Sequence, residues 1–266
     1  TAANGAPAIQ SLGAGDTLTE TFHVATADGT PSTVTITIHG SNDGATIAGT
    51  ASGSVTEDVA VDAGNIATSG TLTVSDPDAG ESNFVAQAGT PGSHGTFTLD
   101  VNGAWTYTAL NGAPAIQALG AGDTLTETFQ VVTADGTPST VTITIEGTND
   151  GATVAGTDAG SVTEDVGVNA GNIATNGTLT VSDADGGEAV FTAQPGTPGS
   201  YGTFALDTAG GWTYTADNGQ AAIQQLGAGD TLTETFTVVT ADGTSSSVTI
   251  TIHGTNDGAT VAGTDT

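Results

Sequence analysis

Ser-Thr-Val-Thr-Ile-Thr-Ile-Glu, at residues 139–146, is the stretch that decides the fold. Val and Ile alternate with Thr along it, so one face is apolar and the other carries hydroxyl groups, as in a half-buried β-strand. Residues 125–131 alternate in the same way, and the turn residues Asp, Gly and Pro lie between the two stretches, at 134–138. Together they predict a β-hairpin.

The strand at residues 139–146 returns at residues 32–39 and 246–253, because the whole chain repeats at a period of 107 residues. The 266 residues hold about two and a half repeats. A fixed period of this length predicts an array of similar domains. The residues that recur at this 107-residue spacing include Asn42-Asp43, Asn149-Asp150 and Asn256-Asp257; Asp16, Asp123 and Asp230; and Trp105 and Trp212.

The first half of each repeat holds further short strands separated by turn residues. About seven strands per 107 residues predict an all-β fold of tandem antiparallel β-sandwiches of immunoglobulin-like type. Residues 113–119 are predicted to form one helical turn. In the first complete repeat the further strands are expected at residues 70–76, 83–87, 95–100 and 104–108, and near Val55.

The segment Gly-Thr-Asn-Asp-Gly after the last strand cannot continue the alternation and predicts a junction. We therefore place complete sandwiches at residues 45–151 and 152–258, and the start of a further repeat at 259–266. Residues 1–44 correspond to the C-terminal half of a repeat. Since half a sandwich should not be stable alone, its other half belongs either to a longer chain, which we favour, or to another copy that completes it by strand exchange.

The chain has no Lys or Arg against 29 Asp and Glu, giving a formal net charge of −29. It lacks the side chains that neutralise phosphate, which excludes nucleic-acid binding and predicts repulsion from anionic membranes. No apolar run reaches the roughly 18 residues of a membrane-spanning helix, so we expect no membrane insertion. The acidity is either a self-repelling, soluble surface or a set of ligands for a divalent cation. The lack of Lys and Arg favours the cation.

The acidic residues gather in turns, at strand ends and at the junctions. A single Asp-x-Asp is weak evidence of a site because turns favour Asp, but here the same positions recur in every repeat. Calcium takes about six to eight oxygen ligands, which loops at one end of a sandwich can supply. The recurring positions are Glu57-Asp58, Asp76, Asp78, Glu81 and Asp135, and then Glu164-Asp165, Asp183, Asp185, Glu188 and Asp242.

Several motifs resemble a known family. The Asp-Gly turn at residues 28–29, the Thr/Val strand at 34–38 and Asn-Asp at 42–43 resemble the end of a cadherin repeat. Ser-Val-Thr-Glu-Asp at 54–58 and Gly-Thr-Leu-Thr-Val-Ser-Asp-Pro-Asp at 70–78 resemble more closely the VCBS repeat. That repeat is the cadherin-like module of giant bacterial adhesins of RTX type, which are exported by type I secretion. The resemblance covers the whole chain and implies tandem cadherin-like sandwiches.

In cadherin-like arrays, calcium binds between consecutive domains and stiffens the rod, so the resemblance implies Ca²⁺ as the cofactor. Two departures predict fewer ions per junction than in cadherins. Gly40 and Gly147 replace a further Asp, and a chain without Arg cannot hold the Asp-Arg-Glu motif. Glu81 and Glu188 are additional candidates. The implied ligands are Asn42, Asp43, Glu57, Asp76, Asp78 and Asp135 for the first junction, and Asn149, Asp150, Glu164, Asp183, Asp185 and Asp242 for the second.

The sequence does not predict an enzyme. The His residues are not kept between repeats, since His23 corresponds to Gln130 and Thr237. A Gly-x-Ser-x-Gly elbow and a Cys nucleophile are both absent. The paired carboxylates lie among turn residues, whereas acid–base catalysis of glycoside hydrolysis needs one carboxyl in an apolar pocket.

We therefore expect structural extender repeats of a secreted adhesin or surface fibre on the bacterial cell surface, stiffened by calcium at the inter-domain junctions. The expected partners are neighbouring repeats of the same chain and other copies in a fibre. Two alternatives stay open. One is a self-assembling extracellular matrix filament, and the other is a calcium-dependent carbohydrate-binding module that uses Trp105 and Trp212.

Overall fold

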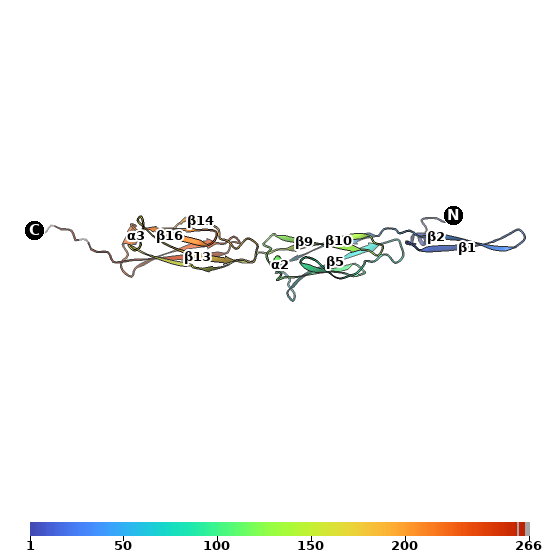
Figure 1. The fold of residues 1–266 in the computed structure, drawn as a ribbon, viewed down its shortest axis with the longest axis horizontal. Helices are drawn as coiled ribbons and strands as arrows, with labels where there is room; N and C mark the ends of the chain where they lie inside the picture. Colours follow the sequence, from blue (N-terminus) through green and yellow to red (C-terminus); the bar gives the residue numbers. More distant parts are fainter. Residues whose placement is uncertain (260, 264–266) are drawn as a thin grey trace. The chain divides into compact units, whose positions relative to one another are not determined.

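The computed structural model describes residues 1–259 and 261–263. The chain divides into two compact units, residues 1–148 and the part from residue 149 onward. Each unit contains one complete two-layered β-sandwich, and the first unit also contains a separate hairpin (Figure 1). The helices among the described residues are single turns of four residues. The predicted all-β fold of tandem sandwiches is confirmed.

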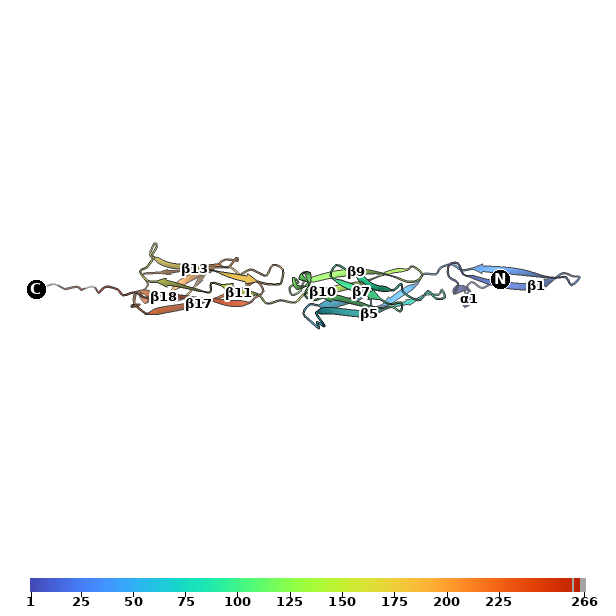
Figure 2. The ribbon, with the colours of Figure 1, turned by 60° about the horizontal axis from the view of Figure 1, so that its bottom comes forward.

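The first sandwich consists of a five-stranded sheet in the order β3-β5-β8-β7-β6 and a three-stranded sheet in the order β4-β10-β9. Figures 1 and 2 show β5 and β9 in opposite layers. All strand pairs are antiparallel except β4 with β10. The elements are β3 (Thr46–Gly49), β4 (Ser52–Thr56), β5 (Asn65–Ser75), β6 (Gln87–Pro91), β7 (Gly95–Leu99), β8 (Ala104–Leu110), α2 (Pro114–Gln117), β9 (Thr124–Val132) and β10 (Pro138–Glu146).

The sandwich has eight strands because the segment before Glu57 divides between the two sheets. β3 pairs with β5 in one sheet, and β4 pairs with β10 in the other. Gly49, the last residue of β3, has φ +95°, and a Cβ there would come within 2.5 Å of the Thr71 carbonyl oxygen. A glycine therefore allows the chain to leave one sheet and cross to the other. The predicted strand near Val55 is β4, and the predicted helical turn is α2.

Aromatic side chains fill the space between the layers. The rings of Phe97 and Phe129 stack with centroids 4.8 Å apart. Trp105 is 1% exposed and Tyr107 is fully buried. The indole Nε1 of Trp105 donates a hydrogen bond to the Thr50 carbonyl at 2.8 Å. Since a buried ring with a satisfied N–H cannot stack on a sugar, this geometry removes the basis for the carbohydrate-binding alternative, and Trp212 is equally buried.

The second sandwich repeats this arrangement, with sheets ordered β11-β13-β16-β15-β14 and β12-β18-β17. Its elements are β11 (Thr153–Gly156), β12 (Ala159–Thr163), β13 (Asn172–Ser182), β14 (Gln194–Pro198), β15 (Gly202–Leu206), β16 (Gly211–Asp217), α3 (Ala221–Gln224), β17 (Thr231–Val239) and β18 (Ser245–His253).

Residues 1–44 form α1 (Pro7–Gln10) and a hairpin of β1 (Thr17–Ala25) and β2 (Pro31–His39). This hairpin has the register of β9 and β10 but not their burial. Phe22 is 48% exposed, whereas its counterpart Phe129 is 4% exposed. The apolar face of β1 and β2 thus corresponds to half of a sandwich core, as the repeat period predicts. The domain boundaries near residues 44, 151 and 258 stay predictions.

Among the described residues, no helix has the length and apolar character needed to cross a membrane.

Candidate metal centre

Three acidic side chains converge in the loop that follows β5. Asp76, Asp78 and Glu81 each direct a carboxylate oxygen to a common region, with these oxygens all within 4.8 Å of one another. Ser82 Oγ accepts a hydrogen bond from the Asp76 amide at 3.0 Å, and Asp76 Oδ1 accepts one from the Asp78 amide at 2.8 Å. These local bonds fold the loop so that its acids face inward.

One oxygen of each of these carboxylates is buried without a hydrogen-bond partner among the described residues: Asp76 Oδ2, Asp78 Oδ1 and Glu81 Oε2. Asp78 as a whole is only 2% exposed. Burying a charged oxygen without compensation costs several kcal/mol. The chain has no Lys or Arg to pair with them, so the cluster is suited to an external cation.

The linker before the sandwich is tied to the same loop. The Asp43 amide donates a hydrogen bond to Asp78 Oδ2 at 2.8 Å. The Asn42 side-chain amide donates to the Asp43 carbonyl at 3.2 Å. Asp78 therefore holds the linker with one oxygen and presents the other to the cluster.

Residues of the preceding half-repeat also contact this loop. The Ala79 amide donates a hydrogen bond to the Ser11 carbonyl at 3.2 Å. A Cβ on Gly13 would lie 2.8 Å from Glu81 Oε1, so Gly13 lies directly against the Glu81 carboxylate. Asp16 Oδ2 accepts a hydrogen bond from the Gly13 amide at 3.2 Å. The loop at residues 11–16 and the acidic loop thus meet at the carboxylates.

The electrostatics of the cluster favour a cation. Burial raises the pKa of Glu81 above its usual value, and the neighbouring carboxylates of Asp78, Asp76, Asp135 and Asp16 raise it further. Repulsion among like charges would be relieved by a bound divalent ion. A cluster of carboxylate oxygens matches the ligand preference of calcium, so the residues present fit the implied metal.

Asp16 is a member of this group that the motifs did not identify as a ligand. Its recurrence with the 107-residue period as Asp123 and Asp230 was the available signal. Periodicity alone cannot say which end of a sandwich a residue faces, and here the contact between loops decides it.

Asp135, a predicted ligand, accepts four hydrogen bonds in this structure. Its Oδ1 accepts hydrogen bonds from the Thr133 hydroxyl and the Thr137 amide, and its Oδ2 accepts from the Thr137 hydroxyl and, at 3.0 Å, from the Ala45 amide. These bonds, with that of Thr133 first, hold the pKa of Asp135 well below its usual range. Because all four acceptor positions of the carboxylate are occupied, the arrangement supports a role in fixing the linker and not a ligand role.

Glu57 does not join the first cluster with which its sequence position groups it. Its amide donates to the Glu146 carbonyl and its Oε1 accepts from the Thr148 amide, each at 2.9 Å. Glu146 ends β10, whereas Asp135 lies in the turn before β10. Glu57 therefore lies at the opposite end of the sandwich, because β3 and β4 carry the chain along its whole length.

The second unit repeats the local pattern. The Asp150 amide donates to Asp185 Oδ2 at 2.8 Å, and the Ala152 amide donates to Asp242 Oδ2 at 3.0 Å. Buried oxygens of Asp183 and Asp185 again have no hydrogen-bond partner among the described residues. The remaining predicted ligands are placed as their counterparts are: the Asn149 side chain donates to the Asp150 carbonyl at 3.0 Å, and Glu164 Oε1 accepts from the Thr255 amide at 2.7 Å.

The chain matches a known family model over two ranges. The sequence model of the bacterial cadherin-like domain matches residues 42–147 and 149–254. No curated protein matches the chain significantly.

Among solved structures, the chain is similar to mouse cadherin-23 EC22–24, with 15% identity over 91% of this chain and 74% of that one and a TM-score of 0.42. It is also similar to the protocadherin gamma B7 EC3–6 cis-dimer structure, with 13% identity over 90% of this chain and 57% of that one and a TM-score of 0.46. A third is the human desmocollin-1 ectodomain, with 15% identity, coverage of 90% and 48%, and a TM-score of 0.37. The chain spans about half the length of the latter two.

Proposed function

The chain belongs to the family of bacterial cadherin-like domains, and on that premise we propose that it forms extender repeats of a secreted adhesin or surface fibre of VCBS type, stiffened by calcium. The observation that carries this proposal is the cluster of Asp76, Asp78 and Glu81. Its buried oxygens have no donor among the residues that the structure describes, and the preceding half-repeat contacts it. Such a function is mechanical: the repeats hold a binding end away from the bacterial surface.

Calcium would be held by Asp76, Asp78 and Glu81, with Asp16 and Asp43 beside them. Bound there, the ion supplies the positive charge that the chain lacks. The protein itself connects the two parts of this junction. Ser11 and Gly13 contact the acidic loop from one side, and the Asp43 amide bonds the linker to Asp78. A bound calcium ion would neutralise the carboxylates. Their mutual repulsion would then no longer oppose the contacts that hold the junction together.

The affinity expected of extracellular modules is weak, with dissociation constants of about 0.1–1 mM. Extracellular calcium reaches this level and cytosolic calcium does not. The repeats would therefore be flexible before export and stiff outside the cell, which is consistent with a location on the bacterial surface.

Small-angle X-ray scattering of the whole chain tests the proposal. We expect the maximum dimension to increase and the distribution of interatomic distances to narrow when calcium replaces a chelator. The same change should be absent from a variant in which Asp76, Asp78, Asp183 and Asp185 are all replaced by Asn. Magnesium at equal ionic strength controls for screening. An identical scattering profile in calcium and in chelator would contradict calcium stiffening.

A second candidate function is a subunit of an extracellular matrix filament. The exposed apolar face of β1 and β2, with Phe22 and Ile36 each about half exposed (48% and 49%), favours it, because another copy that supplied the first half of a repeat would bury this face. Sedimentation separates the two functions, since a filament elongates with concentration and an extender stays monomeric.

A further inference from the structure

The three-stranded sheets end in a long edge strand whose outer side is only partly covered. β9 pairs with β10 alone, and β17 pairs with β18 alone. At the C-terminal end of β9, the Val132 carbonyl accepts from the Val85 amide at 2.9 Å, and the Gln130 carbonyl accepts from Gln87 Nε2 at 2.7 Å. Both carbonyls point away from β10, so the even-numbered residues of β9 direct their main-chain groups outward.

By this alternation, Thr124, Thr126 and Thr128 also present their amides and carbonyls to the open side of β9. In the part of the chain that the structure describes, no other strand pairs with them. The second repeat is built in the same way: the Gln194 side chain donates to the Thr237 carbonyl at 2.8 Å and leaves Thr231, Thr233 and Thr235 uncovered.

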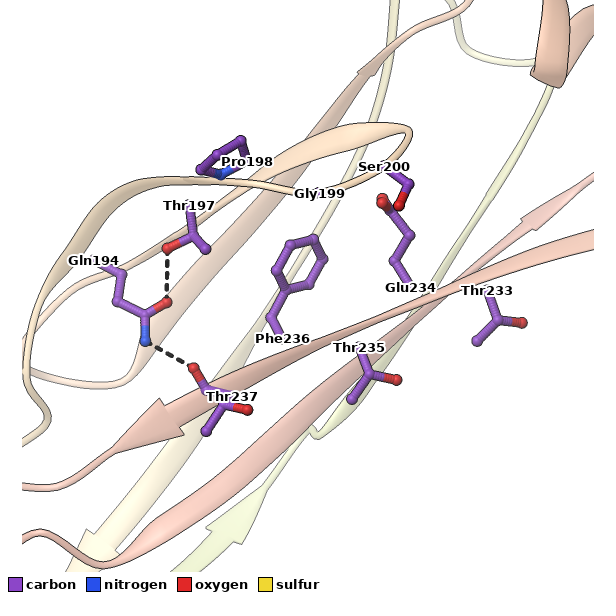
Figure 3. Close-up of a pocket in the computed structure, with 10 residues that line it drawn as sticks. All are labelled: Gln194, Thr197, Pro198, Gly199, Ser200, Thr233, Glu234, Thr235, Phe236 and Thr237. Carbon is purple, nitrogen blue, oxygen red and sulfur yellow. Dashed lines mark hydrogen bonds between the residues drawn. The ribbon is translucent and has the colours of Figure 1, made fainter.

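A groove follows each open edge. In the second unit it has a volume of about 530 Å³ and lies between the turn at residues 198–200 and β17. Figure 3 shows Glu234 and Phe236 pointing from β17 toward that turn, while Thr233 and Thr235 point to the other side of the strand. The equivalent groove beside β9 has a volume of about 400 Å³. An extended segment lying in the groove would face the unpaired main chain of the edge.

The groove contains a buried carboxylate, Glu127 in one repeat and Glu234 in the other, 6% and 7% exposed. Glu127 Oε1 accepts from the His94 amide at 2.9 Å, and Oε2 accepts from the Tyr107 hydroxyl. Two of its four acceptor positions are thus used, and two remain. An inward-facing charge on an edge strand disfavours pairing with any strand that cannot neutralise it.

The carboxylate of Glu127 or Glu234 determines which kind of strand can add to the open edge. A second copy of the chain has no Lys or Arg and would bring further acidic groups to the groove. A strand with Lys or Arg would instead place a cation beside Glu127 or Glu234, and the net charge of −29 would attract it.

We propose that the open edges of β9 and β17 bind an extended peptide segment that carries Lys or Arg, which adds to the three-stranded sheet as a further strand. Main-chain hydrogen bonds to the outward Thr residues hold the segment, and Glu127 or Glu234 pairs with its cation. This site is independent of calcium and of the proposed extender function.

The test uses the whole chain in calcium and a blocked heptapeptide that alternates Thr with Lys. One control peptide replaces the Thr residues by Pro, which keeps the charge but removes amide donors, and the other replaces Lys by Glu. We expect saturable binding of the Thr/Lys peptide, slowed hydrogen exchange at the amides of Thr126, Thr128, Thr233 and Thr235, and binding of both controls at least tenfold weaker. Equal binding of the Pro peptide, with shifts spread over the acidic loops, would show non-specific charge attraction and overturn the proposal.

Variants separate strand addition from folding effects. Thr128→Pro/Thr235→Pro removes outward amides that do not bond to β10 or β18, so the sheet should persist while peptide binding falls at least tenfold. Thr142→Ala/Thr249→Ala, on the same face of the sheets but on the central strands, should bind normally. If the proline variant fails to fold, Glu127→Gln/Glu234→Gln serves instead and should weaken binding of the Lys peptide about tenfold. Undiminished binding by the glutamine variant, or an edge-dependent dimer of the wild-type chain, would overturn the proposal.

Discussion

The first sandwich holds two kinds of buried or half-buried acidic group. Glu127 and Asp135 are supplied with donors by the fold itself: a tyrosine hydroxyl and an amide for the first, and two threonines and the linker for the second. Asp76, Asp78 and Glu81 each retain a buried oxygen without any donor among the described residues. The difference shows that the fold supplies hydrogen-bond donors to the carboxylates that stabilise the sandwich, and leaves oxygens without donors in the cluster that we propose binds a metal ion.

The second sandwich makes the same distinction. Tyr214 donates to Glu234 at 2.5 Å, and Ala152 donates to Asp242, while Asp183 and Asp185 keep buried oxygens without donors in the described part of the chain. Since the contrast recurs with the repeat, it is a property of the repeating unit. This contrast can be tested in two ways. One removes the acids of the cluster, and the other removes the hydrogen-bonded acids or their donors.

The largest effect is expected from Asp76→Asn/Asp78→Asn. Loss of two charges from the cluster should lower the calcium affinity of the first site about 100-fold, as measured by titration calorimetry, because calcium affinity depends on the number of charged ligands. The control is Asp62→Asn, an exposed position where the next repeat already has Asn169. An unchanged affinity in the double variant would mean that calcium binds elsewhere.

Removal of an acid that is fully hydrogen-bonded within the fold should reduce the stability of the sandwich and leave its calcium affinity unchanged. Asp135→Ala leaves the amides of Ala45 and Thr137 without the acceptor they have in this structure, which should cost about 2–3 kcal/mol of unfolding free energy in urea. Because the folded-state pKa of Asp135 is lowered, its contribution is present above pH about 4 and is lost as pH falls below that. The variant should therefore lose less stability on acidification than the wild type; parallel curves would argue against this role.

Tyr107→Phe/Tyr214→Phe tests the donor of Glu127 and its counterpart. Each substitution leaves a buried carboxylate oxygen unpaired and should cost about 1–2 kcal/mol. Burial, and then the bond to Glu127, raise the pKa of Tyr107 above its usual value. Its contribution is thus present below pH about 10 and is lost as pH rises above it. Stability measured against pH should fall above 10 in the wild type and change less in the variant.

The smallest effect is expected from Asp16→Asn. The amide oxygen can still accept the bond from Gly13, so the loop should keep its shape while one nearby charge disappears. We expect calcium affinity to fall about threefold and the stability of the sandwich in chelator to stay the same. A loss of stability without a change in affinity would indicate that Asp16 only supports its own loop.

Much of this fold follows from the alternation of apolar residues and threonine, which predicts the hairpins, the sandwich and the buried face of β10. The division of the first strand into β3 and β4 does not, because Ile47 and Val55 fit one alternating pattern and only the conformation at Gly49 separates them. For the same reason the sequence places Glu57 beside the first junction, while two short strands carry it to the other end.

The cluster of Asp76 and Asp78 was predictable from the Asp-x-Asp motif and its recurrence. Asp135, in contrast, accepts hydrogen bonds from the hydroxyl groups of Thr133 and Thr137, two residues away on either side. A search for acidic residues alone does not consider these donors. The contact of residues 11–16 with Glu81 joins segments about 70 residues apart, and no local motif reports such a contact.

The most direct test of the central claim is the anomalous scattering of calcium in crystals of this chain grown in millimolar calcium. The account predicts a peak bonded to the oxygens of Asp76, Asp78 and Glu81 that lack protein donors, and no peak bonded to Asp135 or Glu127. The absence of a peak at the cluster, with those oxygens bonded to protein donors, would contradict it.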